Sequence, residues 1–134
     1  MSFPTRRLRR LRTSEKMREL IQETTLTSRD LICPVFVQED LKFRIKVESM
    51  SEIERLPLED ISDEVGTISD LNIPSIMLFG IPTKKDDAGT SAFDDNGIVQ
   101  KAISQIRKNF GDKIVIMADV CLCQFTSTGH CGII

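Results

Sequence analysis

The chain has 134 residues and a mass of 15.1 kDa, the size of one domain or of part of a larger one. Hydrophobic residues make up 40% and charged residues 28%, a balance that argues against a disordered chain. No apolar run reaches the roughly 18 to 20 residues of a membrane-spanning helix, and no apolar segment of a signal peptide follows the arginine-rich start. We therefore expect a globular protein of the cytoplasm without a membrane partner.

The net charge of −2 conceals a basic arm on an acidic body. Residues 1–18 carry seven basic side chains and one acidic one, a balance of +6, and the other 116 residues carry 11 basic and 19 acidic side chains, a balance of −8. Such an arm is compatible with nucleic acid, an anionic surface or an acidic neighbouring subunit as its partner. Phe3 is its only aromatic residue, so a base-stacking platform is not supported and nucleic acid is the disfavoured partner.

The arm is expected to span residues 1–25. Within it, Thr-Ser before a polar, helix-prone run predicts a helix between residues 13 and 23. The sequence LICPVFV at residues 31–37 then predicts a strand buried on both faces, because it is short, apolar and rich in β-branched residues. Pro34 argues against a fully paired central position unless it lies at a bulge or at the strand start. Cys33 lies inside this apolar run and is predicted to be a core residue.

The remaining elements alternate between helices and strands. Residues 38–56 are polar and predict an irregular segment. Apolar residues spaced three or four apart predict helices over residues 58–71 and 97–110. Short apolar runs predict two further buried strands, over residues 76–81 and 114–120.

This order predicts a βαβαβ unit with a parallel sheet and right-handed crossovers. Two architectures fit it, part of a (β/α)8 barrel or a doubly wound sheet, and in both the functional groups lie at the carboxyl ends of the strands. Three strands are about three-eighths of a barrel and leave a parallel edge open. A cysteine-rich segment begins at the carboxyl end of the third predicted strand.

Three of the four cysteines, Cys121, Cys123 and Cys131, lie within eleven residues. In a reducing compartment such clustering predicts metal binding rather than disulfides. Residues i and i+2 of an extended segment point to the same side, so Cys121 and Cys123 can reach one ion, and a glycine-flanked turn can return Cys131. Three thiolates suit zinc. Three possibilities stay open: a closed structural site with His130 as the fourth ligand, a site whose fourth position takes water or substrate, and buried cysteines without a metal.

Asp119 ends the third predicted strand, directly before the cysteines. A carboxylate at the end of an apolar strand costs free energy to bury unless it is paired or hydrogen-bonded. Asp119 is therefore a candidate acid, base or charge partner, and the alternative is a cap or turn residue.

The segment DVCLCQFTSTGHCG at residues 119–132 resembles the zinc loop of the porphobilinogen synthases, also called delta-aminolevulinic acid dehydratases. Four further segments resemble motifs of that family in the same order: RRLRRLR at 6–12, LICPVFV at 31–37, the segment 81–92 and NGIVQKA at 96–102. Several motifs in order are more specific than the cysteines alone. The resemblance implies an α/β fold, a partial TIM (β/α)8 barrel made of the first three βα units over residues 26–134, after an extended or helical amino-terminal arm.

The resemblance also implies an activity, a hydro-lyase that condenses two 5-aminolevulinate molecules to porphobilinogen with loss of two waters, early in haem and other tetrapyrrole biosynthesis. It implies Cys121, Cys123 and Cys131 as ligands of a catalytic zinc, Asp119 as the active-site aspartate, and His130 as a neighbour of the metal. Zinc is the implied cofactor, with Mg2+ open as a second one. The implied partners are the small-molecule substrate 5-aminolevulinate and further copies of the chain, commonly eight, assembled through the arms.

Family enzymes form Schiff bases through two lysines. Five lysines of this chain do not match those motifs: Lys84, Lys85, Lys101, Lys108 and Lys113. Because family members are more than twice as long, we expect an amino-terminal part that carries the metal half of the site without the covalent half. The alternative is a non-catalytic zinc-binding fragment or an assembly partner of a full-length synthase. Phe125 and Thr128 stand where Tyr and His are usual, which alters the expected hydrogen bonding around the metal.

Overall fold

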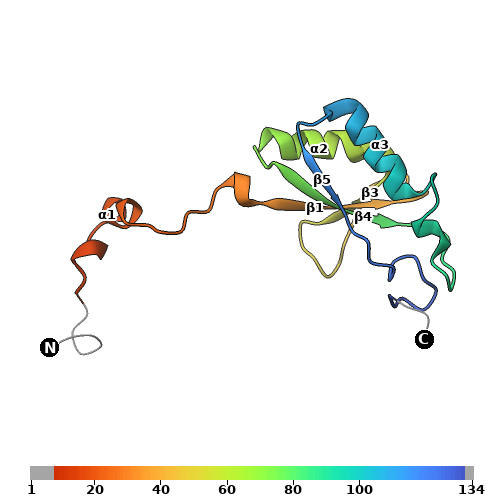
Figure 1. The fold of residues 1–134 in the computed structure, drawn as a ribbon, viewed down its shortest axis with the longest axis horizontal. Helices are drawn as coiled ribbons and strands as arrows, with labels where there is room; N and C mark the ends of the chain where they lie inside the picture. Colours follow the sequence, from red (N-terminus) through yellow and green to blue (C-terminus); the bar gives the residue numbers. More distant parts are fainter. Residues whose placement is uncertain (1–7, 132–134) are drawn as a thin grey trace.

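One five-stranded sheet forms the centre of the computed structural model, which describes residues 8–131 (Figure 1). Arg6 and Arg7 of the predicted basic arm lie outside the described residues. The strand order is β2-β3-β1-β4-β5, and every pairing is parallel except that of β2 with β3. The strands are β1 (Ile32–Gln38), β2 (Ile45–Lys46), β3 (Glu54–Leu56), β4 (Ser75–Ile81) and β5 (Val115–Ala118).

Both helices that connect the parallel strands cover one face of the sheet (Figure 1). α2 (Ile61–Asp70) joins β3 to β4, and α3 (Ile98–Phe110) joins β4 to β5. The predicted helix over 58–71 begins with a tighter turn, η3 (Leu58–Asp60), before α2. A second such turn, η4 (Thr90–Ala92), lies in the segment before α3. No helix within residues 8–131 is long and apolar enough to cross a membrane.

The hydrophobic core lies between the sheet and these two helices. Alternate strand residues face the helices because successive side chains of a strand point to opposite faces. The core members are buried to 9% exposure or less. Those from β1, β4, α2 and α3 include Val37, Ile76, Leu78, Ile61, Val65 and Ile106, and Ile114 joins them from the residue before β5. Cys33, predicted to be a core residue, is only partly buried and packs against this core.

The other face of the sheet carries no helix in the described structure. The prediction that the strands are buried on both faces was therefore wrong for β1 and β5, since Ile32 and Val115 are exposed on this face. Phe36 of β1 stacks on Phe79 of β4, with ring centroids 4.8 Å apart. Arg55 of β3 is in register with Phe36, so it lies on the same face as Phe36 and Phe79, with β1 between β3 and β4. In a (β/α)8 barrel this helix-free face is the inner one.

Residues 38–56 are not irregular throughout, since β2 and β3 form within them. That prediction was wrong because these strands have only two and three residues, too few for a hydrophobic period to be visible. β3 forms where Arg55 and Leu56 pair with Phe36 and Val37 of β1. This pairing does not extend to Pro34, which is in register with Met77 of β4. Pro34 is therefore accommodated inside the ladder, near the start of β1.

The amino-terminal segment extends away from the sheet and helices (Figure 1). It contains η1 (Arg10–Arg12), the short helix α1 (Glu15–Leu20) and η2 (Ser28–Asp30). Ser14 caps α1, because its side chain accepts a hydrogen bond from the Met17 N–H at 3.2 Å. Large apolar side chains of the amino-terminal segment are exposed: more than three-quarters of the surface of Leu8, of Leu20 and of Leu26 is accessible to solvent. A six-residue helix without tertiary packing is marginal in water, so this segment needs a partner surface for stability.

Gly80 of β4 lies against α3, and we expect Gly80→Ala to lower the free energy of unfolding by about 1–3 kcal/mol through overpacking. A Cβ atom there would lie 2.3 Å from Val99 Cγ2 and 3.0 Å from Ile98 Cγ2. Gly66→Ala in α2 is the matched control, because its Cβ would meet nothing closer than 3.9 Å. That change should raise the stability by roughly 0.5–1 kcal/mol through helix propensity. Urea denaturation of both variants measures this, and equal shifts would contradict the close approach.

Candidate metal centre

The cysteine loop, residues 119–131, leaves the sheet at the carboxyl end of β5. Asp119 starts it: its N–H donates to the Leu78 carbonyl of β4 at 3.1 Å. Its carboxylate Oδ1 accepts a hydrogen bond from the Cys121 N–H, also at 3.1 Å. Asp119 is thus a turn residue at the point where the chain leaves the sheet, and it precedes the first cysteine by two residues.

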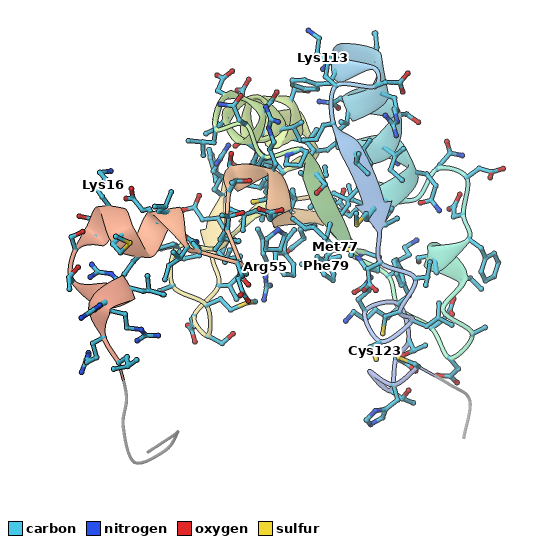
Figure 2. All side chains as sticks on the ribbon, turned by 60° about the vertical axis from the view of Figure 1, so that its left-hand side comes forward. Lys16, Arg55, Met77, Phe79, Lys113 and Cys123 are labelled. Carbon is cyan, nitrogen blue, oxygen red and sulfur yellow. The ribbon has the colours of Figure 1, made fainter. Side chains whose placement is uncertain are left out.

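The loop brings the three predicted cysteines together. Cys131 Sγ lies 2.9 Å from Cys121 Sγ and 2.8 Å from Cys123 Sγ, and all three sulfurs lie within 4.8 Å of one another. None of them is in a disulfide. Figure 2 shows Cys123 in the loop at the end of the molecule opposite Lys113.

This donor set fits a metal ion. Three sulfurs bound to one tetrahedral zinc at about 2.3 Å stand roughly 3.8 Å apart, so Cys131 Sγ, at 2.8 and 2.9 Å from the other two, would move outward by about 1 Å to share an ion with them. The other cysteine of the chain, Cys33, lies in β1 and is not in the cluster. Within residues 8–131 these three cysteines form the one group of three or more potential ligands that lie close enough together to hold an ion.

Contact among the thiols changes their acidity in the metal-free loop. Hydrogen bonding with Cys131, and then with Cys121, raises the pKa of Cys123 to about 12. Hydrogen bonding with Cys121, and then with Cys123, lowers the pKa of Cys131. The thiol of Cys131 therefore loses its proton more readily than that of Cys123.

The neighbouring predicted residues lie close to this cluster but outside it. His130 is exposed, and its side chain does not join the group of three sulfurs. Thr128 is also exposed, and its Oγ1 accepts the His130 N–H at 3.4 Å. Phe125, at the position where a Tyr is usual, is buried to 4% exposure and packs in the hydrophobic core.

A second loop, residues 82–96 after β4, supports the cysteine loop. Asp86 and Thr126 form an isolated parallel bridge between the two loops. The Asp86 N–H donates to the Phe125 carbonyl at 3.3 Å, and the Ser127 N–H donates to the Asp86 carbonyl at 3.0 Å. The Ser127 hydroxyl also donates to the Asp87 carboxylate.

No role was predicted for these supporting residues from the sequence. Asp86 closes its own turn by accepting hydrogen bonds from the N–H and the hydroxyl of Thr90. Asp and Thr four residues apart in a polar loop are a turn signal, and it could have identified the turn. It could not have identified the partner, which lies about 40 residues further along the chain.

A cleft of about 370 Å³ lies between α3 and the cysteine loop. Asp119 and Cys121 lie on one side of it, and most of its walls are apolar. The apolar lining includes Phe93, Val99 and Ile103. The site therefore combines thiols, a carboxylate and an adjoining apolar cleft at the carboxyl edge of a parallel sheet.

These features define a class: a segment of a β/α barrel with a thiol-rich, metal-binding loop at the carboxyl ends of its strands. The family model for delta-aminolevulinic acid dehydratase matches residues 5–134. The chain belongs to the delta-aminolevulinic acid dehydratase family, and the doubly wound alternative is thereby set aside.

Individual relatives agree with this assignment. The chain is 47% identical over all its residues to a delta-aminolevulinic acid dehydratase of Bacillus subtilis (strain 168), and 45% identical to one of Methanothermus sociabilis. It spans 41% of the length of each. The crystal structure of delta-aminolevulinic acid dehydratase (porphobilinogen synthase) from Toxoplasma gondii ME49, in complex with the reaction product porphobilinogen, superposes with a TM-score of 0.89 at 31% identity. That match covers 96% of this chain and 37% of the other.

Proposed function

We propose that this chain is the amino-terminal, metal-binding part of a porphobilinogen synthase, which condenses two 5-aminolevulinate molecules to porphobilinogen with loss of two waters. The observation that carries the proposal is the convergence of three free thiols at the carboxyl edge of the sheet, in a chain of this family. In this proposal residues 1–25 form the assembly arm and residues 26–134 the first part of the barrel. The proposed compartment is the cytoplasm, where thiols stay reduced and available to a metal.

Cys121, Cys123 and Cys131 are the proposed ligands, and zinc is the proposed metal because three thiolates suit it. A bound zinc supplies Lewis-acid polarisation and a template for the substrate. Asp119, two residues before the first ligand, holds the Cys121 N–H and offers a carboxylate that can orient a substrate amine or exchange a proton with it. We propose Mg2+ as a second metal of the complete protein. Assays of porphobilinogen formation with and without added Mg2+ test this.

Reconstitution tests the activity. We propose that the Schiff-base lysines reside in a part of the protein other than these 134 residues. The purified chain alone should bind zinc and form no porphobilinogen. Addition of a polypeptide that carries the later barrel strands of a family member should produce porphobilinogen. Product formation by the 134-residue chain alone would contradict the proposed division of the site.

A second role, as an assembly partner of a full-length synthase, is favoured by the exposed leucines of the arm. Leu8 and Leu20 of the arm, and Leu26 directly after it, have no core to cover them within the described chain. The arm is basic, and the remainder of the chain is acidic, so a neighbouring copy is a suitable partner. Capture of an intact synthase by the purified chain would favour this role, whereas capture of a polypeptide with only the later strands would favour the split enzyme.

For the arm, we expect deletion of residues 1–12 to reduce the oligomer size of the complete protein and to leave one zinc per thiolate site. The deletion removes exposed apolar and basic side chains, Leu8 and Leu11 among them, but none of the cysteine loop. Sedimentation velocity measures the size, and metal analysis measures the zinc. A sedimentation profile identical to that of the parent would contradict assembly through the arm.

Zinc affinity should rise with pH. Zinc binds thiolates, so a thiol that is protonated in the free protein must lose its proton on binding. Because the pKa of Cys123 is raised to about 12, this thiol is protonated at pH 7. At least one proton is then released per zinc, and the affinity should increase by about tenfold or more per unit between roughly pH 6 and 8. Competition with a chelator of known pH dependence measures this, and a flat profile would contradict it.

A further inference from the structure

Thr126 lies where the cysteine loop meets its supporting loop. It is buried to 4% exposure, although its neighbours Ser127 and Thr128 are exposed. The backbone of Thr126 forms the parallel bridge with Asp86, so the supporting loop holds it in place. A buried hydroxyl requires a hydrogen-bond partner, and the partner here belongs to the cysteine loop itself.

The hydroxyl of Thr126 closes the turn that leads to the last cysteine. Its Oγ1 donates to the His130 carbonyl at 2.9 Å. That carbonyl belongs to the peptide bond that joins His130 to Cys131, so the hydrogen bond orients the peptide unit that carries the third sulfur. The Thr126 carbonyl accepts the Gly129 N–H at 3.3 Å, and Gly129 takes the left-handed conformation that the turn requires.

We propose that Thr126 is a positioning residue for the thiolate site, and that its hydroxyl holds Cys131 within reach of Cys121 and Cys123. The inference rests on the proposed metal-binding function. The chain between Cys123 and Cys131 has seven residues and no regular secondary structure, so without such a closure Cys131 would sample many positions. Pre-organising the third ligand reduces the ordering that metal binding must otherwise impose.

Asp86 contributes to the same positioning from the protein surface. Its carboxylate fixes the turn of the supporting loop through Thr90, and its backbone is paired on both sides of Thr126. Asp86 is exposed, so its side chain can be removed without opening the core. A substitution at Asp86 is therefore a second test of the positioning, and it does not require the buried position of Thr126 to accept a different side chain.

The test compares variants of the purified 134-residue chain for zinc affinity, by chelator competition, and for the thiolate-to-metal absorption of the Co2+-loaded protein. Thr126→Val keeps the branched shape and removes the hydroxyl, whereas Thr126→Ser keeps the hydroxyl. Thr67→Val is the control: the Thr67 hydroxyl of α2 likewise donates to a carbonyl four residues away, that of Asp63, at 3.0 Å. Thermal unfolding of the metal-free variants reports their stability.

We expect Thr126→Val to weaken zinc binding by about 10- to 100-fold and to change the Co2+ absorption, as for other groups that orient a ligand. Thr126→Ser and Thr67→Val should bind as the parent does, and Asp86→Ala should lose about tenfold. If Thr126→Val does not fold, Asp86→Ala decides, and parent-like affinity in it overturns the proposal.

Three further results would overturn it: parent-like affinity in Thr126→Val, equal loss in Thr126→Ser, or equal loss in Thr67→Val. Absence of zinc binding by the parent chain is a different result, because it refutes the thiolate site itself and the positioning role with it.

Discussion

Replacement of Cys123 by Ser is expected to lower the zinc affinity of the chain by at least about 100-fold. Structural zinc sites gain roughly 10–16 kcal/mol from four ligands, so one thiolate accounts for about 3 kcal/mol. A serine hydroxyl in its place does not ionise near neutral pH and is a harder donor than zinc prefers. Cys123 Sγ lies 2.8 Å from Cys131 Sγ, so the change removes a central member of the cluster.

Cys33→Ser is the matched control for this experiment. It is the same chemical change at the one cysteine outside the loop, in β1 at the edge of the core. We expect it to leave one zinc per chain and an unchanged affinity, although it places a hydroxyl near apolar neighbours. Zinc content is measured after dialysis against a weak chelator. Equal zinc content in Cys123→Ser and the parent would refute the assignment of the ligands.

The second large effect is expected at Asp119. In the complete protein, Asp119→Asn should lower the rate of porphobilinogen formation by about 100-fold or more, the range for loss of a general acid or base. The asparagine keeps an oxygen that can accept the Cys121 N–H, so the start of the cysteine loop should stay in place. Zinc stoichiometry should therefore remain that of the parent.

The contrast between these readouts separates two roles of Asp119. If it acts only as a turn residue, Asp119→Asn retains both zinc and activity, and the catalytic assignment fails. If it acts on the substrate, activity falls while zinc is retained. Asp119→Ala, which removes the acceptor as well, should lower both zinc affinity and activity. Steady-state kinetics with added 5-aminolevulinate, together with metal analysis, distinguishes these outcomes.

The predicted elements that were correct are those with a strong local pattern. The apolar period of α2 and α3, and the β-branched runs of β1, β4 and β5, are visible within windows of a few residues. β5 is shorter than predicted, Val115–Ala118, and its register with β4 ends where Leu78 meets Ala118. The boundaries depend on the neighbouring strand, and the sequence pattern does not contain it.

In the candidate site, too, some features were predictable from the local sequence and others depend on tertiary contacts. The types and spacing of its cysteines are local facts, and they predicted a thiol cluster with Asp119 beside it. The role of Thr126 was not predictable from its position in the motif, because Thr is as common in turns that bind nothing. Its burial and its hydrogen bond to His130 follow from contact with the supporting loop.

By itself, the sequence determined the order of the main strands and helices, the family, and the thiol donors, because each depends on residues close together in the chain. Only the tertiary structure decided the short strands β2 and β3, the bridge between Asp86 and Thr126, and the hydrogen bond from Thr126 to His130. The strands and the bridge are pairings of backbone groups, which every residue type except proline can provide. Such pairings leave little trace in composition or periodicity, and the bridge forms only because β4 and β5 pair side by side and bring the two loops that follow them together.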